Sequence, residues 1–277
     1  MSHWTKYELD LAAWLCRLAY SKDAQALEAA LKTQGWTLAD VIRNSDTDTN
    51  GYLARDVMGN MALVFPGTTS WTNVRTDLNA EPESGLGATV HEGFWKAYKS
   101  VAKQVQVAIE RNPVMFIRPN PFPQSAVRGG AISLLIVGHS LGAAIATLAA
   151  LDLSYTQFAQ NIGLITFGAP RVGFRDFADQ FSERMGQRYV RVVYQADFIP
   201  QVPMSPYKHI GGLLHINAAG REVGAIRRGI TTAWYWLRSF FKLGIGLTKD
   251  GCPPEHHIHL YQNAIKMMDA NWSRDHE

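Results

Sequence analysis

SLLIVGHSLGAAIATLAALDL, from Ser133 to Leu153, is the most informative stretch of this chain. Its branched aliphatic residues Leu134 to Val137 lead into Gly138-His139-Ser140-Leu141-Gly142, which is followed by closely spaced alanines. Alanine is a strong helix former of little bulk, so the order predicts a strand, a sharp turn and a helix. A serine at such a turn, here Ser140, has its hydroxyl pushed out above the carboxyl end of the strand.

This turn also predicts chemistry. The flanking glycines are needed because a side chain there would clash between strand and helix, and the first N–H groups of the helix can receive a developing oxyanion. The pentapeptide alone is a weak signal, since it arises by chance in about one chain in ten of this length. A glycine-rich turn without chemistry is the alternative, but the strand before the turn and the small-residue helix after it favour a nucleophilic serine.

Length and composition limit the class of protein. The 277 residues, 47% of them hydrophobic, suit one large α/β domain over 1–277. A net charge of +3 without a basic, aromatic-interleaved run argues against a nucleic-acid partner. Cys16 and Cys252 are the only cysteines, so no disulfide framework is predicted and a single bridge between them stays open. Lys6, Glu8 and Asp10 interrupt the apolar core of a signal peptide, so we expect a cytoplasmic protein or export by a signal-less route.

Helical and apolar segments alternate along the chain. Amphipathic or small-residue patterns predict helices at 7–20, 24–31, 90–111, 141–153 and 174–185. Apolar runs predict strands at 61–65, 134–137, 161–167 and 189–196, and a hairpin built around Asn217 to Gly220 is expected over 212–224. This alternation predicts a mostly parallel central sheet with helices on both faces.

Two segments outside that alternation are unusual. Trp71 to Leu78 forms a short helix-like segment next to a flexible Pro82–Gly85 stretch, as a movable lid would. ITTAWYWLRSFFKLGIGL, residues 230–247, is largely aromatic or aliphatic around a helix, but Arg238 and Lys242 interrupt it, so it does not match a transmembrane helix. Two hypotheses remain for this segment: a helix packed over the sheet, or a cap or interfacial helix with snorkelling basic residues, within an insertion at about 225–250.

A serine nucleophile needs a base in contact with it and a carboxylate that orients the base. Asp197 comes just after a predicted strand, where catalytic groups gather in open α/β sheets, whereas the other downstream aspartates lie in helices or in a loop. In α/β-hydrolases the histidine comes last, and the chain offers His256, His257 and His259. This cluster also suggests a zinc site with Cys252, but no second pair of ligands stands at metal spacing.

Taken together, these residues resemble the class 3 lipases, an α/β-hydrolase family that includes the fungal triacylglycerol lipases. The resemblance extends over most of the chain. The motifs that carry it are VFPGTTSWTNVRTDL (64–78), VHEGFWKAY (90–98), VGHSLGAAIA (137–146), ITFGAPRVG (165–173), ADFIPQVP (196–203), YKHIGG (207–212) and EHHIHLY (255–261).

The resemblance implies a role for each matching position. Ser140 would be the nucleophile, Asp197 the orienting acid and His256 the base, with His257 as a competitor for the last role. Thr68, through its N–H and hydroxyl, and Leu141, through its N–H, would form the oxyanion hole. Trp71 to Leu78 corresponds to the lid, and no metal or organic cofactor is implied.

The resemblance also predicts the activity, which is hydrolysis of carboxylic esters of lipids through an acyl-enzyme. The alternatives are a phospholipase A or short-chain carboxylesterase with the same triad, and a non-catalytic membrane- or lipid-binding module that uses 230–247. Pro66 stands where the family usually carries arginine, so an ion pair from that arginine is absent. The 113–130 and 225–250 segments look like additions to the family pattern, so we expect them to reshape the acyl pocket and do not carry over the substrate choice of the fungal relatives, above all their preference for triacylglycerols.

Overall fold

The structure, a computed structural model, describes residues 4–68, 81–112, 134–156, 162–223, 256–270 and 272–274. Four of the sequence predictions lie outside these residues: the lid at 71–78, the 113–130 addition, the 225–250 insertion with its helix at 230–247, and the state of Cys252. Cys16 is buried, and its thiol lies 3.9 Å from the carbonyl oxygen of Phe65. Among the described segments, no helix is long and apolar enough to cross a membrane.

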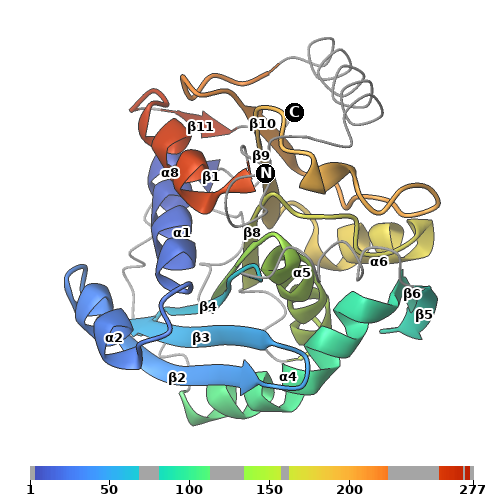
Figure 1. Cartoon of the computed structure of the whole chain (residues 1–277), viewed down its shortest axis with the longest axis horizontal. Coiled ribbons are helices and arrows are strands. Elements are labelled where there is room, and N and C mark those ends of the chain that lie inside the picture. Colours follow the sequence, from blue (N-terminus) through green and yellow to red (C-terminus); the bar gives the residue numbers. More distant parts are fainter. Residues whose placement is uncertain are drawn as a thin grey trace.

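A twisted seven-stranded sheet forms the centre of the fold (Figure 1), with the strand order β10-β9-β8-β7-β4-β3-β2. The strands are β2 (Trp36–Asn44), β3 (Thr49–Asp56), β4 (Met61–Phe65), β7 (Leu134–His139), β8 (Ile162–Phe167), β9 (Tyr189–Tyr194) and β10 (Leu213–Ile216). Neighbours from β10 to β4 pair in parallel, and β4, β3 and β2 pair antiparallel. The mostly parallel sheet predicted from the sequence is confirmed.

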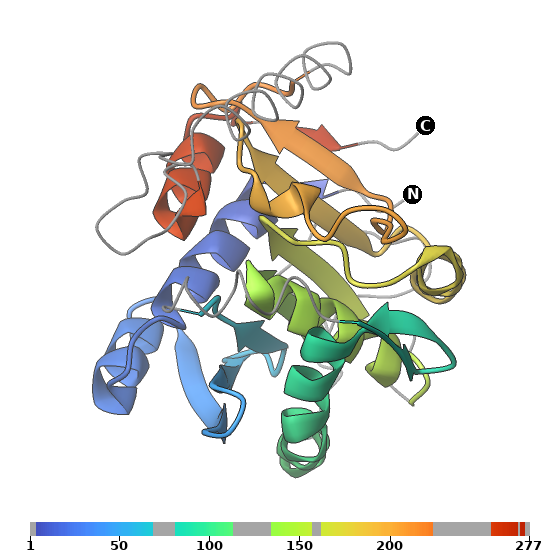
Figure 2. The same cartoon turned by 45° about the vertical axis from the view of Figure 1, so that its right-hand side comes forward.

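Helices cover both faces of this sheet, as predicted (Figure 2). The helices are α1 (Lys6–Leu18), α2 (Ala24–Lys32), α4 (Glu92–Arg111), α5 (Leu141–Leu153), α6 (Arg175–Met185) and α8 (Ile258–Lys266). Side chains of α4, α5 and α6 pack with one face of the sheet into one apolar core, and those of α1, α2 and α8 pack with the other face into a second core. The central strands β4, β7 and β8 are buried along their whole length, because both faces are covered.

Two parts of the sheet differ from the sequence prediction. The polar segment 44–50 contains, at residues 45–48, the turn of a hairpin between β2 and β3, two strands whose mixed composition did not predict them. The hairpin expected over 212–224 is present, with a turn at Asn217 to Gly220 and an antiparallel bridge between Ile216 and Glu222, but its first strand, β10, also pairs in parallel with β9, which the sequence did not predict. The physical reason is burial, because Leu214 and Ile216 enter the core and draw β10 into the sheet.

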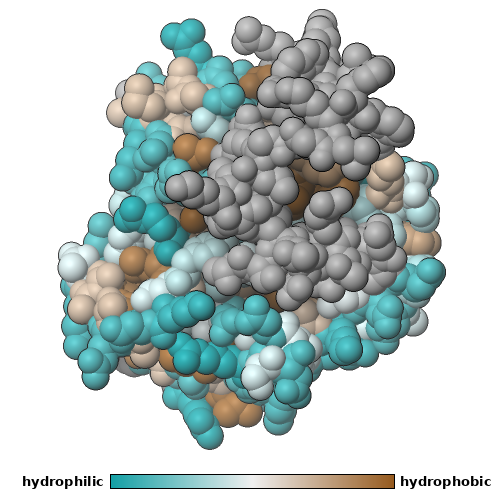
Figure 3. Space-filling model, viewed as in Figure 1, coloured by the Kyte–Doolittle hydropathy of each residue, from teal (hydrophilic) through white to brown (hydrophobic). Residues whose placement is uncertain are grey.

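The remaining strands are short and lie outside the central sheet. β1 (Trp4–Thr5) pairs with β11 (Ser273–Arg274), and β5 (Pro82–Gly85) pairs with β6 (Ala88–His91). In the face shown in Figure 3, hydrophilic residues dominate the described surface over α2, β2 and α4, whereas hydrophobic side chains lie near its centre.

Candidate active site

The turn between β7 and α5, which carries Ser140, is a tight strand-to-helix turn. Ser140 has φ 56° and ψ −128°, a positive φ that is strained for a residue with a side chain. The glycines on either side are required by contact. A Cβ on Gly138 would lie 2.3 Å from the carbonyl oxygen of Gly142, and a Cβ on Gly142 would lie 2.2 Å from that of Pro66. The sequence motif therefore folds as expected, because only glycine lets strand, helix and the segment after β4 approach this closely.

Ser140 lies at the carboxyl end of β7, beside the end of β8. Its backbone N–H donates to the carbonyl oxygen of Phe167 at 3.0 Å, and the residue is fully buried. Its Oγ makes no hydrogen bond with any of the described residues. Hydrogen bonds of this kind are often completed only when substrate binds.

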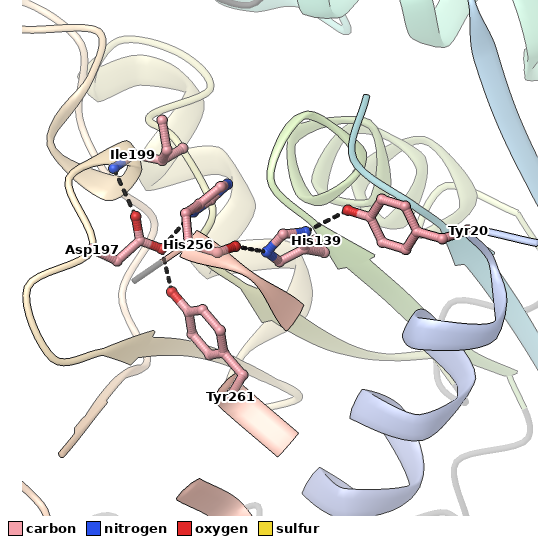
Figure 4. Close-up of polar contacts among 6 residues, drawn as sticks. All are labelled: Tyr20, His139, Asp197, Ile199, His256 and Tyr261. Atoms are coloured by element: carbon pink, nitrogen blue, oxygen red, sulfur yellow. Dashed lines mark hydrogen bonds and ion pairs between the residues drawn. The ribbon is translucent and has the colours of Figure 1, made fainter. Parts of the chain in front are cut away.

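Asp197 and His256 form a buried pair near this turn (Figure 4). His256 Nδ1 donates to Asp197 Oδ2 at 2.6 Å, and both side chains are fully shielded from solvent. The other carboxylate oxygen of Asp197 accepts the backbone N–H of Ile199 at 3.0 Å. Asp197 follows β9 and His256 precedes α8, so the fold brings together two residues far apart in the sequence.

Of the neighbouring histidines, His256 is the one that reaches Asp197. The ring of His257 instead faces that of His259, with 5.4 Å between their centroids, and His259 is exposed. The described residues contain no group of three or more histidine, cysteine or acidic side chains that could hold a metal ion. The sequence motif left a choice between His256 and His257, and in the structure only His256 of these two bonds to Asp197.

Two further residues contact the pair, and the sequence analysis assigned neither a role. The Tyr261 hydroxyl donates a very short hydrogen bond to Asp197 Oδ2, and burial together with this carboxylate raises the pKa of Tyr261 well above its usual range. Tyr261 therefore stays protonated and gives Asp197 a third donor. Gly168, with φ +58°, lies against the pair, since a Cβ there would be 2.7 Å from His256 Cε1 and 2.8 Å from Asp197 Oδ2. In the sequence, the one sign of this role is that Gly168 directly follows an apolar strand and precedes Ala169-Pro170.

Thr68 and Leu141 lie together beside the nucleophile turn. Both residues line the same two cavities, of about 280 Å³ and 430 Å³. Leu141 begins α5, whose first N–H groups have no acceptor within the helix. Tyr20 and His139 lie on the same side. The Tyr20 hydroxyl is 2.6 Å from His139 Nδ1.

Comparison with known proteins agrees with this architecture. The sequence profile of the family described as lipase (class 3) matches residues 62–207, more than half of the chain. A lipase of Rhizopus niveus is 34% identical over 176 residues, which cover 61% of this chain and 40% of that protein. A secreted mono- and diacylglycerol lipase A of Penicillium cyclopium is 29% identical over 208 residues, 72% of this chain and 61% of that protein. The chain thus spans less than two thirds of the length of either relative.

Solved structures extend the likeness to the fold. A Rhizomucor miehei lipase in a propeptide complex is 26% identical, with a TM-score of 0.61 over 77% of this chain and 70% of that chain. A triacylglycerol lipase whose catalytic centre is formed by a serine protease triad is 25% identical, with a TM-score of 0.62 over 77% of this chain and 82% of that chain. With its α/β-hydrolase fold, and with the family profile matching more than half of its length, this chain belongs to the class 3 lipases.

Proposed function

We propose that this protein is a serine hydrolase that cleaves carboxylic ester bonds of lipids through a Ser-His-Asp triad and an acyl-enzyme. The observation that carries the proposal is the buried, hydrogen-bonded pair of Asp197 and His256 beside the strained turn of Ser140. A lipid-binding module without activity has no need of a buried base and an acid that orients it. The pair therefore favours catalysis over the binding alternative.

In the acylation step, Ser140 Oγ attacks the ester carbonyl carbon while His256 Nε2 takes the hydroxyl proton. The carbonyl π electrons move to the oxygen, and the N–H groups of Thr68 and Leu141, with the Thr68 hydroxyl, stabilise that oxyanion. When the tetrahedral intermediate collapses, the bond to the alcohol oxygen breaks and His256 returns the proton to the leaving alcohol. Water then attacks the acyl-enzyme with the same base, which finally gives its proton back to Ser140 Oγ.

Asp197 acts on this cycle through His256. By accepting the Nδ1 proton it fixes the tautomer in which Nε2 carries the lone pair, and it stabilises the imidazolium that forms. The bonds from Ile199 and Tyr261 hold the carboxylate in that orientation. No step of this chemistry requires a metal or an organic cofactor.

The substrate class rests on kinship with lipases. We propose a lipid ester presented at a lipid–water interface, with Trp71 to Leu78 as a lid and 230–247 as an interfacial or cap helix within one domain that spans 1–277. The Penicillium relative is named as an enzyme of mono- and diacylglycerols, and one structural relative as a triacylglycerol lipase. Acyl chain length and head group are therefore the properties to measure first.

Hydrolysis of p-nitrophenyl esters from C4 to C16 tests the proposal. We expect Ser140→Ala to lower turnover by about 10⁵–10⁶-fold. Ser182→Ala is the matched control and should keep wild-type activity, because its hydroxyl on α6 bonds within the helix and to Tyr189, away from the triad. If both variants were equally active, the triad assignment would be wrong. A maximum at long chains supports a lipase, and a maximum at C4 supports a short-chain esterase.

A further inference from the structure

A chain of hydrogen bonds links the segment after β4 to His256 through the side chains of Tyr20 and His139, and Figure 4 shows its part from Tyr20 to His256. The Gly67 N–H donates to the Tyr20 hydroxyl oxygen at 2.8 Å, and that oxygen is 2.6 Å from His139 Nδ1. On the other side of the ring, His139 Nε2 is 2.7 Å from the carbonyl oxygen of His256. The chain thus joins the residue before Thr68 to the backbone of the base.

The direction of each bond follows from the inventory of donors. A carbonyl oxygen can only accept, so His139 Nε2 must carry a proton and donate it to His256. In a neutral imidazole the other nitrogen is then an acceptor, so the Tyr20 O–H donates to Nδ1. The Tyr20 oxygen keeps a lone pair for the Gly67 N–H. One arrangement of protons therefore satisfies all three bonds.

The surroundings of His139 keep its ring neutral. The residue is 3% exposed, and its ring stacks on that of His256 with 4.6 Å between the centroids. Burial, and then the neighbouring His256, lower the pKa of His139 well below its usual range. A neutral His139 leaves the positive charge of the catalytic cycle to His256, whereas a charged ring at this distance would oppose it.

Close packing makes this chain of bonds stiff on the side of the oxyanion hole. A Cβ on Gly67 would lie 2.7 Å from the Tyr20 hydroxyl oxygen and 2.8 Å from Ser140 Cβ. Gly67 is therefore held between Tyr20 and the nucleophile turn. Thr68 follows it directly, so a shift of Gly67 moves the Thr68 N–H.

We propose that Tyr20 and His139 are positioning residues, which hold the oxyanion-forming segment and the catalytic histidine at a fixed separation. The proposal rests on the proposed function, since it assigns what the two side chains do for that reaction. Neither residue takes a proton or attacks the ester in the proposed mechanism; each acts through the segment that it holds. By fixing these two segments, they keep the oxyanion donors and His256 in the positions that the transition state needs. A displacement of about 1 Å of a group in such a site costs about 10²-fold in rate.

The test compares kcat and KM of variants, per active site titrated with a p-nitrophenyl phosphonate. For Tyr20→Phe we expect a loss of about 10–100-fold in kcat with little change in KM. The substrate still binds, but the Thr68 N–H is held less firmly in the position where it stabilises the oxyanion of the transition state. Tyr98→Phe is the matched control: it removes another buried tyrosine hydroxyl, which bonds to Asp152 on the α4–α5 side, and should keep wild-type kcat.

Two substitutions of His139 separate its two bonds. Glutamine places an amide N–H near the Nε2 position and can still donate to the His256 carbonyl, so His139→Gln should retain most of the kcat. Asparagine reaches only the Nδ1 position and loses that donor, so His139→Asn should lose more. This rescue by the longer amide is not expected of a side chain that merely fills space.

Equal kcat in Tyr20→Phe and Tyr98→Phe would overturn the proposal, and so would equal losses in the two His139 variants. A fall confined to the number of titratable sites would also overturn it, since that reports folding alone. Failure of the proposed function is a separate outcome, seen when Ser140→Ala remains as active as the wild type.

Discussion

Gly168 offers a sharp test of the proposed site, because its replacement by alanine disturbs Asp197 and His256, the proposed acid and base, together. At φ +58° a side chain is strained wherever it points, and this Cβ would point at the pair. It would lie 2.7 Å from His256 Cε1, 2.8 Å from Asp197 Oδ2 and 2.9 Å from His256 Nδ1. Neither partner can move away freely, since both are buried and bonded to each other.

The size of the effect follows from these distances. Ordinary van der Waals contact begins near 3.4 Å, so the imidazole must retreat by roughly 0.7 Å. Displacements of about 1 Å in a catalytic site cost about 10²-fold, so we expect kcat of Gly168→Ala to fall by about 30–100-fold. The left-handed backbone adds about 1–2 kcal/mol of destabilisation.

Gly186 supplies the control, because it has nearly the same φ, +57°, and a Cβ added there would meet no atom of the described residues within 4 Å. Gly186→Ala should therefore lose similar stability to backbone strain and keep its kcat. Both variants are compared by p-nitrophenyl ester turnover per titrated site and by urea unfolding. If Gly168→Ala kept a kcat within about threefold of the control, the contact argument would be refuted.

Three other perturbations have defined outcomes. Tyr261→Phe removes a donor from a buried carboxylate, so urea unfolding should show a loss of about 1–3 kcal/mol, and kcat should fall several-fold. Burial lowers the pKa of both His139 and His209 well below the usual range, so below about pH 6.5 the unfolded chain binds protons that these rings do not. The free energy of unfolding should then fall by about 1.4 kcal/mol for each ring with every pH unit of acidification. In His209→Gln the free energy of unfolding should therefore depend less steeply on pH between about pH 7 and 5, and an unchanged slope would contradict this. Finally, serine at Trp234, Trp236 and Phe240 should abolish flotation with liposomes while Ser140→Ala still floats, and unchanged flotation of the triple variant would exclude 230–247 as an interfacial helix.

Local sequence patterns predicted most elements of the fold, because burial on both faces makes a strand continuously apolar. β4, β7 and β8 are runs of this kind, and the alanine-rich segment after Ser140 is the buried helix α5. The hairpin of β2 and β3 was missed because buried and exposed positions do not alternate regularly along either strand. The parallel pairing of β10 with β9 was not predicted, because a strand's partner in the sheet is chosen by the core and not by the nearest turn.

The site divides in the same way. The sequence by itself determined the elbow around Ser140, since Gly138 and Gly142 are needed wherever a strand, a sharp turn and a helix follow one another. It also narrowed the candidates for the proposed acid to a residue after a strand, Asp197, and those for the proposed base to a cluster of histidines.

Only the tertiary structure decided which of those histidines meets the carboxylate, and which residues support the pair. His256 and His257 are adjacent and chemically identical, so no spacing rule separates them, but the entry of the chain into α8 turns only His256 toward Asp197. Tyr20, Gly168 and Tyr261 come from three distant segments, and their contacts exist only once the strands lie side by side. A motif records what one turn of backbone requires, whereas a contact between distant segments depends on the packing of the whole sheet.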